Sequence, residues 1–413
     1  MRLRAKLIIL IFLCVFSMHN LQALDIGLLL DQSIDINAQS ADFSERRYEY
    51  SGTIIPRVSA LLGDNGEFVF SAGFNYRTRL VFDNAVNIEP VNIVPELLRT
   101  DLTMRFGMSE LKIGRMPYRD PLGIIADGFF DGASFSHDTN IGTFSAGGWY
   151  TGLLYKTRAN ITMTEEELQY FYRKLDLNDF EKTYFAPSRF FASAGWEHPS
   201  IADLFSVRLA VLGQVDMEGT NLNSQYLTAK FTFPSSYIIL DAGGCLELIQ
   251  YSQELTIAMA ANAGLTFILP AGNEQHLTLR GIYLSGIIPD TQVGAFLPLT
   301  TIPQGNLLKV NPSGLTVIQL SYLAHLHRVF SANLSASYFI RNDLYTYSNY
   351  PVIGVSSDGL FLGTELYMRF IWSMSTGIQM NIGGGTFLPS LGDAVPDADM
   401  LWRAELNIVI SIF

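Results

Sequence analysis

The residues of this chain whose type and spacing suggest a chemical function are basic residues at alternate positions. In the segment 68–82, Arg77 and Arg79 alternate with apolar residues, and similar patterns recur elsewhere. The guanidinium fork of arginine matches carboxylate and phosphate groups, and a wall of such cations favours anions in a pore. The candidate solute-path residues are Arg57, Arg77, Arg79, Arg99, Arg105, Lys112, Arg115, Arg208, Lys230, Arg280, Arg369 and Arg403.

Acidic residues fall on the same predicted faces and leave a second interpretation open. The acids are Asp31, Asp35, Glu67, Asp101, Asp241, Glu247, Glu365 and Glu405. Apart from Arg115, six of the cations fall on the second to fifth predicted strands, where Glu67 and Asp101 oppose them. The cations therefore either guide anions or pair with acids across strands to satisfy a narrow polar interior.

The elements that would carry these side chains are β-strands. In the segment 330–340 the even positions are apolar and the odd positions 331–337 are Ser or Asn, the period of a half-buried strand. The chain is 48% hydrophobic and only 16% charged, which excludes a disordered protein. After the N-terminal segment, apolar runs are broken within about ten positions, whereas a membrane-spanning helix needs about 20. The apolar residues must therefore be spread over many strands.

About eighteen such strands follow one another, and sixteen is the alternative number. They are predicted at 25–36, 47–62, 66–82, 97–108, 109–117, 128–138, 141–155, 188–198, 202–215, 222–233, 235–250, 252–269, 273–286, 314–328, 329–341, 358–372, 373–385 and 400–413. Short and long connections alternate, except near 250–252, where a short one takes the place of a long one. This pattern predicts an all-β fold, a transmembrane antiparallel β-barrel with short periplasmic turns and long outer loops.

The first residues have the features of a targeting signal. Arg2, Arg4 and Lys6 precede an apolar run, and a cleavage site follows at Ala23. We therefore expect a signal peptide at 1–23 and a single barrel domain at 24–413. Cleavage leaves 24 basic and 39 acidic residues, a net charge of −15, and one cysteine, Cys245. The predicted location is the outer membrane of a diderm bacterium.

The chain resembles the outer-membrane channel β-barrels that run from a signal peptide to a terminal aromatic residue, here Phe413. The segment Leu111–Asp131 resembles the corresponding part of alginate-export-type porins. The resemblance implies a channel, with outer-membrane lipid, the barrel-assembly machinery and small solutes as partners. One departure is that Phe413 falls on the face of Glu405 rather than in phase with the apolar row of the last strand.

Two of the predicted outer loops carry features of their own. Thr164 and Glu167 form a capping-box pattern, which predicts a short helix in the segment 163–180. This helix would either narrow the pore or pack against neighbouring loops. The loop 118–127 contains Arg119, Asp120 and Asp127, which form either a selectivity patch or an ion-paired turn.

The sequence favours a passive channel for small polar solutes, including anions. The alternatives are a transporter of hydrophobic molecules and a surface-exposed adhesin or structural barrel. His325 with Ser331 or Ser335 is the sole hydrolase pattern, and alternation alone accounts for it, so we expect no enzyme. The spacing of Asp393, Asp397 and Asp399 departs from an EF-hand, so no metal and no cofactor are expected. Nothing in the charge pattern suggests nucleic acid.

Overall fold

A computed structural model provides the fold. It describes residues 21–39, 45–62, 68–83, 94–164, 167–168, 171, 173, 175–219, 222–251, 254–270, 274–308, 312–346, 359–395 and 398–412. The predicted signal sequence up to residue 20, Phe413 and the side chain of Arg79 lie outside this description.

Eighteen strands make up almost all of the regular structure. The first nine are β1 (Leu21–Gln39), β2 (Glu45–Leu62), β3 (Phe68–Asp83), β4 (Val94–Phe106), β5 (Ser109–Arg119), β6 (Asp127–Thr139), β7 (Gly142–Tyr150), β8 (Arg189–Ile201) and β9 (Phe205–Asp216). The others are β10 (Leu222–Pro234), β11 (Ile238–Tyr251), β12 (Glu254–Leu269), β13 (Gln275–Leu284), β14 (Leu315–His327), β15 (Phe330–Arg341), β16 (Phe361–Ser375), β17 (Ile378–Leu388) and β18 (Leu401–Ile412).

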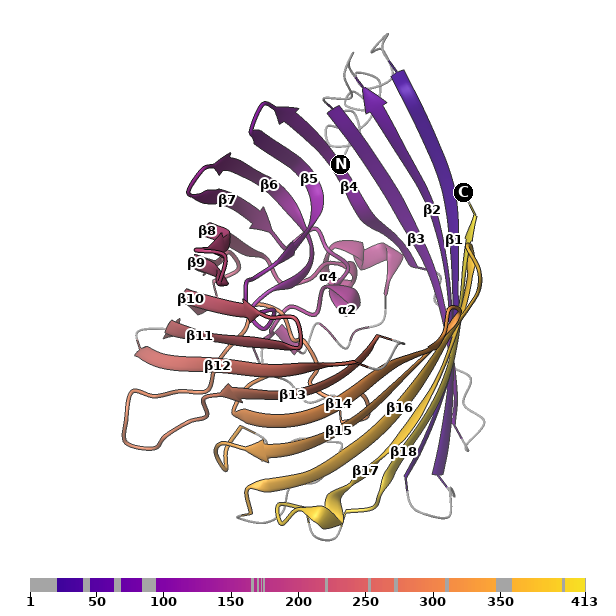
Figure 1. Ribbon diagram of the computed structural model, residues 1–413, viewed down its shortest axis with the longest axis vertical. Coiled ribbons are helices and arrows are strands. Elements are labelled where there is room, and N and C mark those ends of the chain that lie inside the picture. Colours follow the sequence, from indigo (N-terminus) through magenta and orange to yellow (C-terminus); the bar gives the residue numbers. More distant parts are fainter. Residues whose placement is uncertain are drawn as a thin grey trace.

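Each strand pairs antiparallel with the next one along the chain, and β1 pairs with β18, so the sheet closes on itself (Figure 1). The closing seam runs from Leu28 opposite Ile412 to Gln39 opposite Leu401. The prediction of an antiparallel barrel of about eighteen strands is confirmed. A closed sheet leaves no unpaired edge, which is the condition for strands surrounded by hydrocarbon.

The alternation seen in the sequence separates the two surfaces of the wall. On β2, Ile54 points outward and is 46% exposed, whereas its neighbour Thr53 points inward and is 8% exposed. On β15, Leu334 lies outward at 43% and Ser337 inward at 1%. The outer surface therefore exposes large apolar side chains strand after strand, a surface that suits lipid rather than water.

The connections differ in length at the two ends of the barrel. At one end the turns are short, as at Gly107–Met108 and Thr376–Gly377. At the other end lie the β7–β8 loop (151–188) and the β13–β14 loop (285–314), which are the longest. The connection between β11 and β12 is short, as its sequence indicated. The turn that the sequence predicted at residue 373, between the strands 358–372 and 373–385, is wrong. β16 continues to Ser375, because a bulge absorbs the extra residue.

Helical structure is confined to short pieces. Within the described residues, the complete α-helices are α2 (Lys156–Ala159) and α4 (Phe180–Tyr184), residues 167, 168 and 171 are also helical, and 3-10 turns occur at Leu177–Asp179 and Pro389–Leu391. Both α-helices lie within the ring of strands (Figure 1), where the Tyr184 hydroxyl donates to the carbonyl of Pro95 on β4 at 2.8 Å. None of the helices in the described part of the chain is long and apolar enough to cross a membrane.

Candidate functional site: the constricted lumen

The β5–β6 loop (120–126) extends into the lumen, and a buried carboxylate fixes its shape. Asp120 is 3% exposed and accepts hydrogen bonds of 2.9–3.1 Å from the backbone N–H groups of Leu122, Gly123, Ile125 and Ala126. Burial raises the pKa of the Asp120 carboxyl above its ordinary value, and the four N–H donors oppose that rise. The loop is therefore a rigid element rather than a mobile flap.

The tip of the β5–β6 loop reaches a part of the wall that is remote from its own strands. Leu122 packs on Gly243 of β11, which lies five strands further round the barrel than β6. A Cβ atom on Gly243 would lie 2.4 Å from Leu122 Cδ2, so a larger residue there would force the Leu122 side chain to shift. Because the loop leaves the wall at β5 and packs on β11, it occupies part of the lumen. We call it the crossing loop.

We expect a valine at position 243 to displace the crossing loop. Its branched side chain would overlap Leu122 and crowd Asn262 and the Ala229 carbonyl, which pushes the tip of the loop away from the wall into the remaining passage, and we expect the single-channel conductance to fall by about half. Gly281→Val is the matched control, because a Cβ atom at Gly281 meets nothing within 4 Å. Equal conductance of the two variants in planar bilayers would contradict a crossing loop that limits the passage.

Three loops meet at one residue in the lumen. Thr300, in the β13–β14 loop, is fully buried; its N–H donates to the carbonyl of Ile125 at 3.0 Å, and its hydroxyl accepts from the N–H of Asp127 at 3.0 Å. It also pairs through its backbone with Ile161 of the β7–β8 loop. The crossing loop is thus braced by both of the longest loops.

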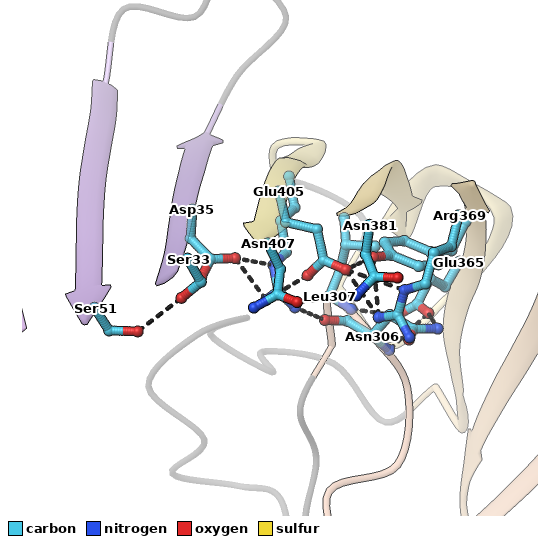
Figure 2. A network of polar contacts seen from close by, with 12 residues as sticks. Ser33, Asp35, Ser51, Asn306, Leu307, Glu365, Arg369, Asn381, Glu405 and Asn407 are labelled. Carbon is cyan, nitrogen blue, oxygen red and sulfur yellow. Dashed lines mark hydrogen bonds and ion pairs between the residues drawn. The ribbon is translucent and has the colours of Figure 1, made fainter. Parts of the chain in front are cut away.

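Buried carboxylates on the wall hold the β13–β14 loop in place. Glu365 of β16 is 1% exposed and accepts from the N–H groups of Asn306, Leu307 and Leu308 at 2.8, 2.8 and 3.0 Å. Figure 2 shows Glu365 next to Asn306 and Leu307. Further round the wall, Glu247 accepts from the N–H of Leu297 at 2.8 Å. Carboxylate acceptors form stronger hydrogen bonds than neutral groups, so each contact ties loop backbone firmly to a strand.

The β7–β8 loop is held by a buried arginine. Arg189 of β8 is 1% exposed and forms ion pairs of 2.8 Å with Glu167 of the loop and Asp216 of β9. The predicted capping box is present, since the Thr164 N–H donates to Glu167 at 2.7 Å and the Glu167 N–H donates to the Thr164 hydroxyl at 3.4 Å. This loop lies inside the ring of strands and also pairs with the β13–β14 loop at Ile161, so it packs against a neighbouring loop, and its role in narrowing the pore stays a prediction.

An aromatic cluster covers the inner face of β5–β8, where polar side chains were expected. Trp149 stacks on Phe191 at 5.0 Å between ring centroids, and Phe130 meets Phe191 edge-on at 4.9 Å. Leu154 and Leu299 of the inward loops complete the cluster. Part of the lumen wall is therefore a dry core beneath the loops. The signal for it is the pair Phe129–Phe130, in which adjacent residues are both aromatic and hence both faces are apolar.

Most of the predicted lumen cations are paired with acids. Ion pairs join Arg99 to Asp101, Arg105 and Lys112 to Glu110, Arg115 to Asp131, Arg208 to Glu197, Arg369 to Glu405, and Arg403 to both Asp35 and Glu405. Arg57 and Arg77 also have partners. Lys230 and Arg280 form no ion pair within the described part of the chain. The cross-strand pairing that the sequence left open thus accounts for many of these residues.

The Arg115 side chain has a structural role and does not line an open path for solutes. Its side chain is 6% exposed and binds Asp131 through two hydrogen bonds of 2.9 and 2.6 Å. It also donates to the carbonyls of Leu97 and Leu153 at 2.6 and 3.0 Å. Arg115 therefore joins β4, β6 and the base of the β7–β8 loop.

A continuous polar network occupies the inner face around the seam. Arg403 pairs with Asp35 across the seam at 2.6 Å and with Glu405 at 2.9 Å, and Glu405 in turn pairs with Arg369 at 2.8 Å. Figure 2 also shows two hydrogen-bonded pairs beside this network, Asn381 with Asn407 and Ser33 with Ser51. The lumen thus has a polar wall on β1, β2 and β16–β18 and a loop-covered wall on β5–β14.

Cations remain accessible at the crossing loop. The side chain of Arg119, at the base of the loop, is 68% exposed, and its Nε atom lies 3.4 Å from Asp127. Arg119 interacts electrostatically with Arg280 of β13, whose other charged neighbour is Asp241 of β11. Of the two interpretations of the 118–127 segment, the ion-paired turn is present, since Arg119 lies next to Asp127 and Asp120 fixes the loop backbone. The selectivity patch stays a prediction.

The hydrolase pattern of His325 with Ser331 or Ser335 does not form a hydrogen-bonded nucleophile and base among the described residues. His325 lies opposite Ser331 in the β14–β15 register, but its Nδ1 atom has no hydrogen-bond partner among the described residues. In the described segments no group of His, Cys, Asp and Glu side chains could hold a metal ion.

Comparisons with known proteins identify the fold. No protein-family model matches the chain, and no curated protein matches it. Among solved structures, Pseudomonas aeruginosa OpdQ has a TM-score of 0.62 at 13% identity, over 95% of this chain and 99% of its own. OccK5 (OpdH) of the same organism has a TM-score of 0.60 at 12% identity, over 94% and 99%.

A third solved structure is that of P. aeruginosa OccK2 (OpdF) in complex with glucuronate. Its TM-score is 0.58 at 13% identity, over 96% of this chain and 99% of its own. The chain therefore has the fold of outer-membrane channel barrels along nearly its whole length. None of these three is an alginate-export porin, so that resemblance stays a prediction.

Proposed function

We propose that the protein is an outer-membrane channel through which small polar solutes diffuse, and that it favours anions. The observation that carries this proposal is the crossing loop, which is fixed inside a closed barrel, has the exposed side chain of Arg119 at its base and places that charge within electrostatic reach of Arg280 on β13. Cations at a constriction act strongly because the low-dielectric wall focuses their field into the pore. The glucuronate bound in the OccK2 structure is a carboxylate, which supports anionic solutes for this fold.

The alternatives of a surface adhesin and a transporter of hydrophobic molecules fit the structure less well. The two longest loops pack within the lumen, which suits control of passage rather than display at the surface. The polar network and the cations would disfavour the passage of hydrophobic solutes. Catalysis forms no part of the proposal.

Charge reversal at the crossing loop tests the proposal. With Arg119→Glu and Arg280→Glu combined, we expect the reversal potential under a salt gradient to change sign toward cation selectivity, because four units of charge change at the narrowest point. Arg328→Glu, in the turn between β14 and β15, is the control. An unchanged reversal potential would eliminate these residues as the filter, and no current from the native protein would eliminate the channel itself.

The wall cations predicted from the sequence form a separate part of the proposal. Arg57 and Arg77 lie on the inner face of β2 and β3, and they would guide anions toward the crossing loop. We also propose cleavage of residues 1–23, contact with outer-membrane lipid and insertion by the barrel-assembly machinery.

A further inference from the structure

A cavity of about 780 Å³ lies beneath the β7–β8 loop, away from the crossing loop. The residues that line it come from the end of β7, from the loop with its helices α2 and α4, and from the connection after β9. They are Tyr150, Gly152, Leu153, Lys156, Met163, Glu167, Phe171, Glu181, Lys182, Phe185, Ala186, Pro187, Ser188 and Glu218. Its volume lies within the range of about 300–1,000 Å³ that is typical of small-molecule sites.

Two charged side chains are buried in the lining. Glu167 is 7% exposed, and although its Oε2 atom binds Arg189 and the Thr164 N–H, its buried Oε1 atom has no partner among the described residues. Lys156 is 4% exposed and donates to the carbonyl of Arg173 at 2.8 Å. Because an unpaired buried acceptor is costly, a hydrogen-bond donor that reached Glu167 Oε1 would be stabilised there.

The rest of the lining combines both signs of charge with aromatic rings. Glu181, Lys182 and Glu218 are exposed at the rim, so a ligand with a net charge of either sign would meet a like charge. Phe171 and Phe185 supply aromatic surface. A hydroxyl group, by contrast, donates to a carboxylate and accepts from an ammonium group, so it suits every polar group here.

We propose that this cavity binds a neutral saccharide. The hydroxyl groups of the sugar donate to Glu167 and Glu218 and accept from Lys182, and the apolar face of the sugar ring packs against Phe171 or Phe185. The β7–β8 loop is held in place by Arg189 whether or not a ligand is present, so the site is preformed. The proposal does not depend on conduction, because a barrel that passed no current could still bind a sugar here.

Binding of maltose, lactose and cellobiose to the full-length protein in detergent tests the proposal, with saturation-transfer NMR as the measurement. We expect saturable binding of at least one of these sugars. Phe171→Ala leaves the ion pairs of Arg189 in place, and we expect it to weaken binding at least about tenfold, as does loss of a central aromatic contact elsewhere. Glu167→Gln should weaken binding to a similar extent. Leu391→Ala and Arg328→Ala lie outside the cavity and should bind as the native protein does.

Two sources could supply the sugar: free oligosaccharide and the saccharide part of lipopolysaccharide. Competition between the panel sugars and the core oligosaccharide released from lipopolysaccharide distinguishes them, since the tighter ligand identifies the source. The proposal is overturned if no sugar binds saturably, if Phe171→Ala and Glu167→Gln both bind like the controls, or if glycine or acetate displaces the sugar at lower concentration. Current measured on the same preparations reports on the channel independently.

Discussion

Replacing Arg189 by alanine should lower the free energy of unfolding by about 3–5 kcal/mol, because it removes the guanidinium that two buried carboxylates share. The side chains of Asp216 and Glu167 are 0% and 7% exposed, so water cannot replace the guanidinium. Since Glu167 anchors the β7–β8 loop, we also expect proteases to cleave this loop in the variant. Urea unfolding in detergent and limited proteolysis measure the two effects.

The matched comparison is Arg208→Ala, at the other end of β9. Arg208 forms an ion pair of the same length with Glu197, but these side chains are 50% and 45% exposed. Exposed pairs contribute about 0–1 kcal/mol, so this variant should unfold nearly like the native protein. If the two variants lost equal stability, the buried arginine would not be the anchor of the loop.

Replacing Glu365 by alanine should release the β13–β14 loop from the wall. The carboxylate accepts from three backbone N–H groups and from the side-chain amide of Asn306, and each buried donor left without an acceptor costs about 1–3 kcal/mol. We expect a larger and noisier single-channel conductance, because this loop braces the crossing loop through Thr300. Planar-bilayer recordings measure both properties.

Glu365→Gln separates charge from shape at this position. Its amide keeps one carbonyl acceptor, so we expect a conductance between those of the native protein and Glu365→Ala. Glu197→Ala, at an exposed carboxylate, is the control. Native conductance and noise in Glu365→Ala would show that the loop keeps its position without the carboxylate.

The fold could be predicted from the sequence because each strand carries its own local signal. The segments that became β3 and β15 alternate so regularly that their limits were predicted within about two residues, and the connection lengths then gave the topology. Prediction failed where the alternation stopped. The segment 141–155 was predicted as one strand, but β7 ends at Tyr150 and the residues after it enter the inward loop.

The candidate site was only partly predictable because its geometry depends on long-range contacts. Alternation places Arg369 and Glu405 on inner faces, but only the register of β16–β18 brings them together. The packing of Leu122 on Gly243 joins parts of the chain that no periodicity relates. A loop that turns inward also reverses the expected polarity, so apolar residues such as Phe130 belong inside.

The seam between β1 and β18 bears on how the protein is made. Arg403 reaches Asp35 and Asn407 reaches Asp31, so the first and last strands are linked by side chains as well as by backbone. Each of these links joins the earliest part of the barrel to the part that the ribosome synthesises last. A nascent fragment that lacks β18 therefore cannot close the barrel. During export, β1 must stay unpaired at this edge, or be bound by another protein, until β18 is present.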